Sequence, residues 1–189
     1  KYTSQKTNKF ISKNKNRYFC FQIASQYNNG QLSNIICSLS KILEKNISIA
    51  LLPLGTVSGH EDYKILERIY KMLSSKRVFI LKDIKLIDSI SLIAHANVFT
   101  GTSLHGNITA MSYAVPHFPL NQHINKLTKY IEKWDIPEIE PCIDYSQIHK
   151  HYDISTKIDR KLLIKNSNRL ISHIDKHVAQ MCKIISSLD

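Results

Sequence analysis

The sequence predicts an α/β domain, with a Rossmann-like, doubly wound parallel sheet followed by a helical tail. Two observations support this fold class. Short apolar runs alternate with segments of helical periodicity four times between Tyr18 and Leu120, and this alternation is typical of a parallel sheet with crossover helices. The runs are apolar along almost their whole length, as expected for strands that are covered on both faces.

The chain divides into three predicted parts. Residues 1–16 are polar and basic and show no periodicity, so we expect a flexible arm or linker there. Residues 17–141 form the Rossmann-like domain and residues 142–189 the helical tail. Because the chain begins with Lys rather than Met, we expect it to be part of a longer protein whose N-terminal domain is absent.

Five strands and four intervening helices account for the central part. The predicted strands are 18–24, 47–52, 78–81, 97–100 and 115–120. The predicted helices are 32–45, 62–74, 84–96 and 105–113. In the first of these helices Ile35, Leu39 and Ile42 recur at helical spacing, and Asn46 ends it.

The chain beyond Leu120 is predicted to be helical. We expect a short helix at 125–134, a helical turn at 145–152 and a long amphipathic helix at 157–188, with a break near Asn166 and Ser167. The apolar stripe of the last helix predicts that it covers the sheet or docks on a partner domain.

The composition limits the classes of partner. Lys and Arg number 26 against 15 Asp and Glu, for a formal net charge of +11, yet no basic stripe is interleaved with aromatic residues, so we expect a solvated basic surface and no nucleic-acid partner. No apolar stretch approaches the roughly 20 residues of a membrane span, and no signal peptide is evident. The four cysteines lack C-x-x-C spacing and indicate reduced thiols. We therefore expect a cytoplasmic protein, with peripheral association with the inner membrane face as an option.

Ligands of an open parallel sheet bind beyond the carboxyl ends of its strands. The loops there supply Ser25, Gln26, Gly55 and His60 as candidate binding residues. The loops contain neither a Walker lysine pattern nor G-x-G-x-x-G. His60 lacks the spacing to other ligands that a metal site requires, so no metal site is predicted.

The strand–loop–helix junction at 100–106 is the most informative segment. A helix that opens here presents unpaired N–H groups and a partial positive charge, which suit a carboxylate or a phosphate. His105 in the first turn can donate a proton or pair with an anion. The other candidate binding residues are Thr102, Ser103, Leu104, Gly106 and Asn107. The structural alternative is an ordinary capped helix with a histidine packed over its start.

Residues 91–120, with the step Ser103-Leu104-His105-Gly106 at their centre, resemble the signature of the polysaccharide pyruvyl transferases. The order of Leu52-Pro53 and the later Glu61-Asp62 is also similar to that family. The resemblance extends over about residues 18–134. It implies one half of a GT-B-like fold, with this chain as the C-terminal domain.

The resemblance also implies an activity. Family members transfer a pyruvyl group from phosphoenolpyruvate to a sugar of a cell-surface polysaccharide, so the donor is a substrate, no cofactor is expected, and the acceptor is a sugar or a lipid-linked oligosaccharide. The family's active-site histidine falls on His105 and a family lysine on Lys126. Ser103 stands where many members have Arg, and Ser25 and Gln26 follow the first strand where members often carry another. Two alternatives therefore stay open: a GT-B-type glycosyltransferase domain that uses a nucleotide sugar, and a non-catalytic domain that binds an anion or docks a partner.

Overall fold

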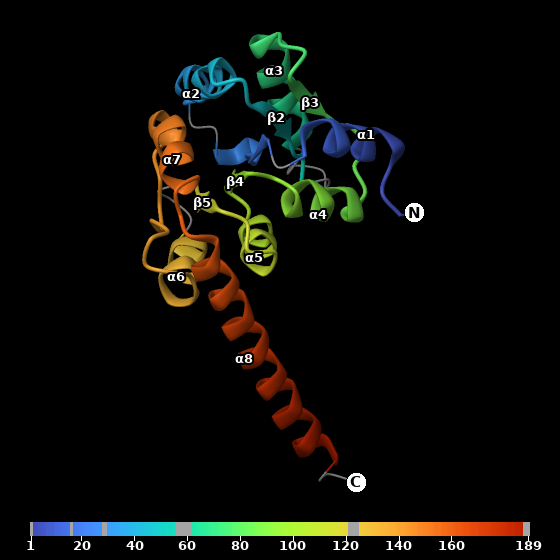
Figure 1. Cartoon of the computed structure of the whole chain (residues 1–189), viewed down its shortest axis with the longest axis vertical. Coiled ribbons are helices and arrows are strands. Elements are labelled where there is room, and N and C mark those ends of the chain that lie inside the picture. The colour runs from blue at the N-terminus through green and yellow to red at the C-terminus, as the bar shows by residue number, and fades with distance from the viewer. Residues whose placement is uncertain (1, 16, 28–29, 56–61, 121–124, 187–189) are drawn as a thin grey trace.

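A computed structural model describes residues 2–15, 17–27, 30–55, 62–120 and 125–186 of the chain. Its centre is a five-stranded sheet in the order β3-β2-β1-β4-β5, with every neighbouring pair parallel (Figure 1). The strands are β1 (Tyr18–Gln22), β2 (Ser48–Leu51), β3 (Val78–Ile80), β4 (Val98–Gly101) and β5 (His117–Pro119). The predicted fold class is confirmed.

Both faces of the sheet are covered by helices. The first face carries Phe19, Phe21 and Leu51, which share a core with α2 (Leu32–Glu44) and α3 (Asp62–Leu73). The second face carries Tyr18, Cys20 and Phe99, which pack with α4 (Leu86–Ala94) and α5 (Leu104–Ser112). Strand residues alternate between the two cores, so the strands are apolar throughout, as the sequence predicts.

The N-terminal segment is not a flexible arm, contrary to our prediction. It forms helix α1 (Gln5–Asn14), in which the Ser4 side chain caps the helix by accepting a hydrogen bond from the Thr7 N–H. Phe10 stacks on Phe79 of β3 with ring centroids 4.5 Å apart. Within the helix Phe10 and Ile11 are the apolar residues, and both pack against the second core. Two adjacent apolar residues give no helical periodicity.

Asp88 joins α1 to the start of α4. Its carboxylate accepts a hydrogen bond from the Ser4 N–H at 2.7 Å and another from the Lys85 N–H at 3.4 Å. Burial alone would raise the pKa of this carboxyl, but the hydrogen bonds from Ser4, Thr7 and Lys85 hold that pKa below its usual value. Helix α4 begins at Leu86, after its N-cap Lys85, two residues later than the start predicted at residue 84.

After β5 come α6 (Asn125–Trp134) and then, in the tail, a 3₁₀ turn at Tyr145–Gln147, α7 (Ile148–Ser155) and α8 (Arg160–Ser186). Helix α8 is continuous over 27 residues, so the predicted break is wrong. Asn166 and Ser167 lie instead where α8 meets the body: the Asn166 amide donates to the Trp134 carbonyl at 3.1 Å, and the Ser167 hydroxyl donates to the Ser112 carbonyl at 2.9 Å.

Most of α8 extends away from the sheet (Figure 1). The root of α8 contacts α5 and α6 through Ser112 and Trp134, so the contacts described for α8 do not confirm that it covers the sheet. Beyond the root the apolar stripe stays exposed, as at Ile174 and Met181. The exposed stripe leaves the prediction of docking on a partner domain untested. None of the helices in the described ranges combines the length and the apolarity that crossing a bilayer requires.

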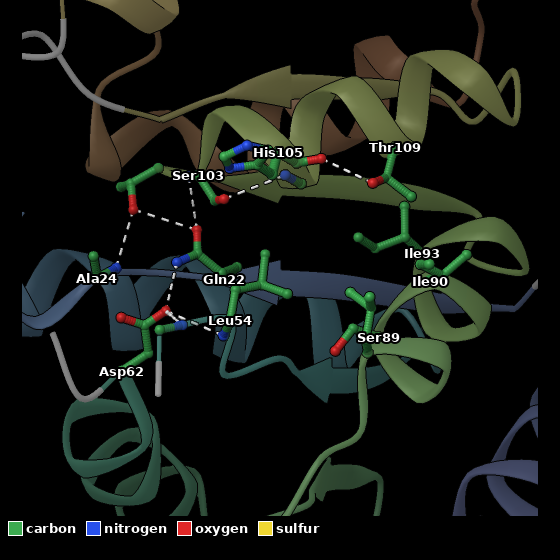
Figure 2. Close-up of a pocket in the computed structure, with 14 residues that line it drawn as sticks. Gln22, Ala24, Leu54, Asp62, Ser89, Ile90, Ile93, Ser103, His105 and Thr109 are labelled. Atoms are coloured by element: carbon green, nitrogen blue, oxygen red, sulfur yellow. Dashed lines mark hydrogen bonds between the residues drawn. The ribbon is translucent and has the colours of Figure 1, made fainter. Parts of the chain in front are cut away.

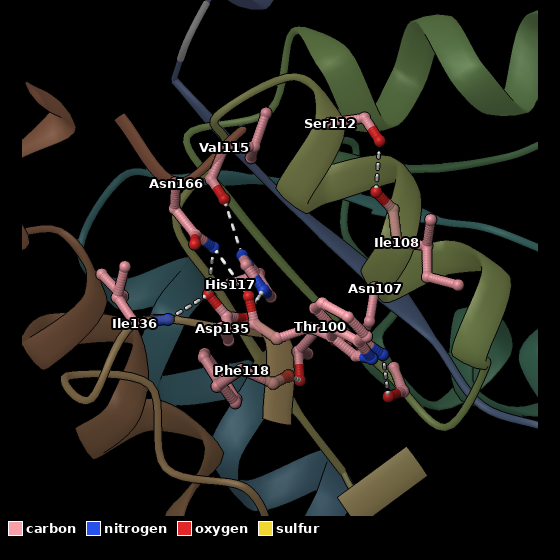
Figure 3. A network of polar contacts seen from close by, with 12 residues as sticks. Thr100, Asn107, Ile108, Ser112, Val115, His117, Phe118, Asp135, Ile136 and Asn166 are labelled. Carbon is pink, nitrogen blue, oxygen red and sulfur yellow. Dashed lines mark hydrogen bonds and ion pairs between the residues drawn. The ribbon is translucent and has the colours of Figure 1, made fainter. Parts of the chain in front are cut away.

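A buried pair of His117 and Asp135 fixes the end of α6 to the sheet (Figure 3). His117 of β5 places Nδ1 at 2.8 Å from the Val115 carbonyl and Nε2 at 2.7 Å from the Asp135 carboxylate, just after α6. The two side chains are 0% and 1% exposed. Both ring nitrogens of His117 therefore face oxygen acceptors, and both contacts are buried. The second carboxylate oxygen of Asp135 accepts from the Ile136 N–H at 2.8 Å.

Removing one partner of this pair is expected to destabilise the protein strongly. Asp135→Ala should lower the free energy of unfolding by about 3–5 kcal/mol, because it leaves a buried charged or unsatisfied imidazole. Urea unfolding followed by circular dichroism measures the loss. Asp153→Ala, which breaks the solvent-exposed pair with Lys45, is the matched control and should have little effect. Equal, small losses in both variants would contradict a stabilising role for the buried pair.

Candidate functional site

A cavity of about 450 Å³ opens at the carboxyl ends of β1, β2 and β4 (Figure 2). This is the edge at which a parallel sheet is expected to bind ligands. Gln22 and Asp62 form its polar floor, whereas Leu86, Ile90 and Ile93 of α4 supply an apolar wall. The start of α5 closes the remaining side with the residues Thr102, Ser103, His105, Gly106 and Thr109.

Hydrogen bonds through the Gln22 amide connect the elements of the floor. The Gln22 Nε2 donates to Oδ2 of Asp62, at the start of α3, at 2.8 Å. The Gln22 Oε1 accepts from the Ser103 N–H at 2.9 Å and from the Thr102 hydroxyl at 3.3 Å. Gln22 and Asp62 are 1% and 2% exposed. One side chain at the end of β1 therefore fixes the starts of both α3 and α5.

Asp62 also organises the end of β2. Its Oδ2 accepts from the Gly55 N–H at 2.9 Å and from the Leu54 N–H at 3.2 Å, in addition to the Gln22 amide. A carboxylate is favourable at the start of a helix in any case, because it faces the positive end of the helix dipole. The cavity floor thus holds a buried carboxylate that is surrounded by donors.

Two glycines allow the chain to approach this floor closely. A Cβ on Gly101 would lie 2.7 Å from the Gln22 Oε1, and a Cβ on Gly106 would lie 2.6 Å from the Phe99 ring. No side chain larger than hydrogen fits either position without movement of the neighbours. The close approach brings the α5 start directly against β1 and β4.

The first turn of α5 combines a cap with an inward-facing amide. Ser103 is the N-cap, and its hydroxyl accepts from the Gly106 N–H at 3.2 Å. Asn107 is fully buried, and its amide donates to the Gly101 carbonyl at 3.1 Å and to the Ser103 carbonyl at 2.8 Å. Asn107 therefore holds the turn in shape. His105 has an exposed side chain on the cavity rim.

The structure brings together half of the predicted site. Five predicted residues line the cavity, namely Gly55, Thr102, Ser103, His105 and Gly106. Five others are described and are not among its lining residues: Ser25 and Gln26 in a 3₁₀ turn, Lys126 on α6, Leu104, and Asn107. Leu104 packs on the core formed with α6. His60 lies outside the described residues.

Sequence reasoning missed Gln22 as a site residue and used Asp62 only as part of the family resemblance. The available signal for Gln22 was a polar residue inside an apolar strand, since a buried amide requires partners. Its partners are 40 and 81 positions away in the sequence, and no local pattern connects them.

Comparisons with known proteins identify a family and a fold. The sequence model of the polysaccharide pyruvyl transferase family matches residues 2–124. No curated protein matches the sequence significantly.

Solved structures show similarity of fold at low sequence identity. The UDP-GlcNAc 2-epimerase of Methanocaldococcus jannaschii, crystallised with UDP-GlcNAc and UDP, superposes with a TM-score of 0.61 at 14% identity, over 92% of this chain and 49% of the epimerase. The C-terminal CMP-Kdo binding domain of WaaA from Acinetobacter baumannii gives 0.57 at 14% identity, over 87% of this chain and 95% of that domain. The chain spans about half the length of the epimerase, and its fold is that of a GT-B-like domain.

The amide of Gln22 is expected to be essential for the stability of the folded protein, because it faces a carboxylate on one side and donors on the other. In Gln22→Glu the introduced carboxyl meets Asp62, so one of the two coupled carboxyls should have a raised pKa. A raised folded-state pKa means that stability is lost as the pH rises. The free energy of unfolding of Gln22→Glu should therefore be closest to that of wild type near pH 4.3. The difference between the two should grow toward pH 8.

Urea unfolding across this pH range measures the effect. Gln22→Leu is the control. It should lose about 1–3 kcal/mol of free energy of unfolding, because buried groups are left unsatisfied, and this loss should vary little with pH. If the two variants show the same pH profile, the contact between the introduced carboxyl and Asp62 is refuted.

Proposed function

Because the chain belongs to the polysaccharide pyruvyl transferase family, we propose that it transfers a pyruvyl group from phosphoenolpyruvate to a sugar of a cell-surface polysaccharide. One observation carries this proposal: His105, inside the matched residues, lies in the first turn of α5 on the rim of the cavity at the carboxyl edge of the sheet.

The proposed reaction requires one acid and a place for two anionic groups. A proton added to the methylene carbon of phosphoenolpyruvate makes the neighbouring carbon electrophilic. One sugar hydroxyl adds to that carbon, the carbon–oxygen bond to phosphate breaks, and a second hydroxyl adds in its place. The products are a cyclic ketal with a methyl and a carboxylate group, and inorganic phosphate. The two hydroxyl protons balance the methyl group and the phosphate.

His105 is suited to supply the first proton. Its imidazole is exposed on the cavity rim, so solvent can reprotonate it after each turnover. The N–H groups of Leu104 and His105 open the helix ahead of its repeating hydrogen bonds, and they are donors for the phosphate or the carboxylate. Lys126, exposed at the second position of α6, is proposed on the family resemblance as a cation for the donor.

The charge of the cavity favours one second candidate. Among the described residues that line it there is no lysine or arginine, although guanidinium groups bind phosphate and carboxylate pairwise. A nucleotide sugar has fewer charges next to its reacting carbon than phosphoenolpyruvate has. The alternative is therefore a glycosyltransferase-like domain that binds a nucleotide sugar at the same cavity.

We expect His105→Ala to abolish pyruvyl transfer. Loss of a general acid should lower kcat by about 10²–10⁴, measured as phosphate released from phosphoenolpyruvate in the presence of acceptor. The melting temperature should stay near that of wild type, because the side chain is exposed. His95→Ala, at an exposed histidine that directly follows α4, is the control and should retain activity. Full activity in His105→Ala would refute the assigned role.

Ligand-induced stabilisation distinguishes the donors. Phosphoenolpyruvate at about 100 times its Kd should stabilise the intact protein by about 2.7 kcal/mol, seen as a rise in melting temperature, while UDP-GlcNAc and CMP-Kdo have no effect. Stabilisation by a nucleotide sugar alone would support the second candidate. Stabilisation by none of these ligands would indicate a domain without donor binding.

A further inference from the structure

A second cavity, of about 300 Å³, lies between α1 and the start of β3. Five cationic side chains line it: Lys6, Lys9 and Lys13 of α1, and Lys76 and Arg77 of the turn before β3. The cavity is at the amino-terminal edge of the strands, opposite the carboxyl edge where the first cavity opens. The two cavities share no lining residue among those described.

Helical spacing aligns the three lysines of α1. Positions i, i+3 and i+7 lie on one face of a helix, so Lys6, Lys9 and Lys13 form a row about 10 Å long at a rise of about 1.5 Å per residue. Phe10, on the same helix, stacks on Phe79 of β3 and holds the row against the sheet. Figure 1 shows α1 lying beside β3.

The positive charge of this cavity has no compensation from its described lining residues, none of which is acidic. Arg77 donates a hydrogen bond to Asn46, a neutral partner. Asp88 contacts the start of α1 through the Ser4 N–H, but it does not line the cavity. Like charges held in one concave site repel one another and raise the local potential, and a bound anion relieves that repulsion.

We propose that this cavity binds clustered phosphate groups, of the kind that an anionic phospholipid surface or a soluble diphosphate presents. Lysine binds phosphate as a compact point charge and needs no single orientation. The positive charge of three ammonium groups and two further cations is more than one monoanion neutralises. We therefore expect a ligand that carries several negative charges. The lysine side chains are exposed, so they reach a ligand without crossing apolar surface.

Binding of the intact protein to three probes tests the proposal. The probes are vesicles of phosphatidylglycerol and phosphatidylcholine, vesicles of phosphatidylcholine alone, and inorganic pyrophosphate. The test variant combines Lys6→Gln, Lys9→Gln and Lys13→Gln. The control variant removes the same charge from exposed positions of α8, as Lys161→Gln, Lys165→Gln and Lys176→Gln. Both variants should keep the wild-type melting temperature.

The test variant should bind anionic vesicles or pyrophosphate about a hundredfold more weakly than wild type, while the control variant loses less than tenfold. Loss confined to the anionic vesicles identifies the lipid surface as the source of phosphate, and loss confined to pyrophosphate identifies a soluble ligand. Equal loss in both variants would show an effect of net charge alone and would overturn the proposal. The proposal would also be overturned if the wild-type protein bound neither the anionic vesicles nor pyrophosphate. The same holds if it bound only a DNA oligonucleotide included for comparison.

Discussion

The buried amide of Gln22 is the constraint on which the candidate site depends. A buried amide is tolerated only when both its ends are hydrogen-bonded. Here one end is held by Asp62 at the start of α3 and the other by the Ser103 N–H at the start of α5. Because Gly101 must leave room for the amide oxygen, the same requirement determines the residue that ends β4. The position of His105 follows from this, since the helix that carries it begins at a point fixed from β1.

The sheet itself is stabilised by a more ordinary division of apolar residues. Successive residues of β1 enter opposite cores, so a shift of register would exchange the two cores and leave neither filled. Helix α1 completes the second of these cores with Phe10. At the other edge, the ion pair of His117 and Asp135 links β5 to the end of α6. The root of α8 is held nearby by hydrogen bonds to Trp134 and Ser112.

Periodicity predicted the elements whose packing is repetitive and missed those that depend on a single contact. All five strands and the four helices between them were found, because each has several apolar residues in phase. Helix α1 was missed because its apolar residues, Phe10 and Ile11, are adjacent and give no helical periodicity. The break predicted in α8 was wrong because Asn166 and Ser167 are buried by partners in other helices. In the site, the local run from Thr102 to Gly106 was accessible to sequence reasoning. The long-range contacts of Gln22 were not.

Charge is distributed unevenly between the two cavities, and this bears on how the site can bind an anion. The cavity at the carboxyl edge contains helix-start N–H groups, hydroxyls and His105, but no lysine or arginine among its described lining. Oriented N–H dipoles act over short distances and favour an anion only in the correct position, whereas ammonium groups attract anions from farther away. Ser103 stands in the place where many family members have Arg. This agrees with a site that binds through N–H groups, because a serine cap leaves the helix start open. A cleft of this type selects its ligand by fit, and the strong general attraction for anions resides at the opposite edge, beside α1. The net charge of +11 is therefore a poor guide to the chemistry of the cleft, because five of its cations gather around the other cavity.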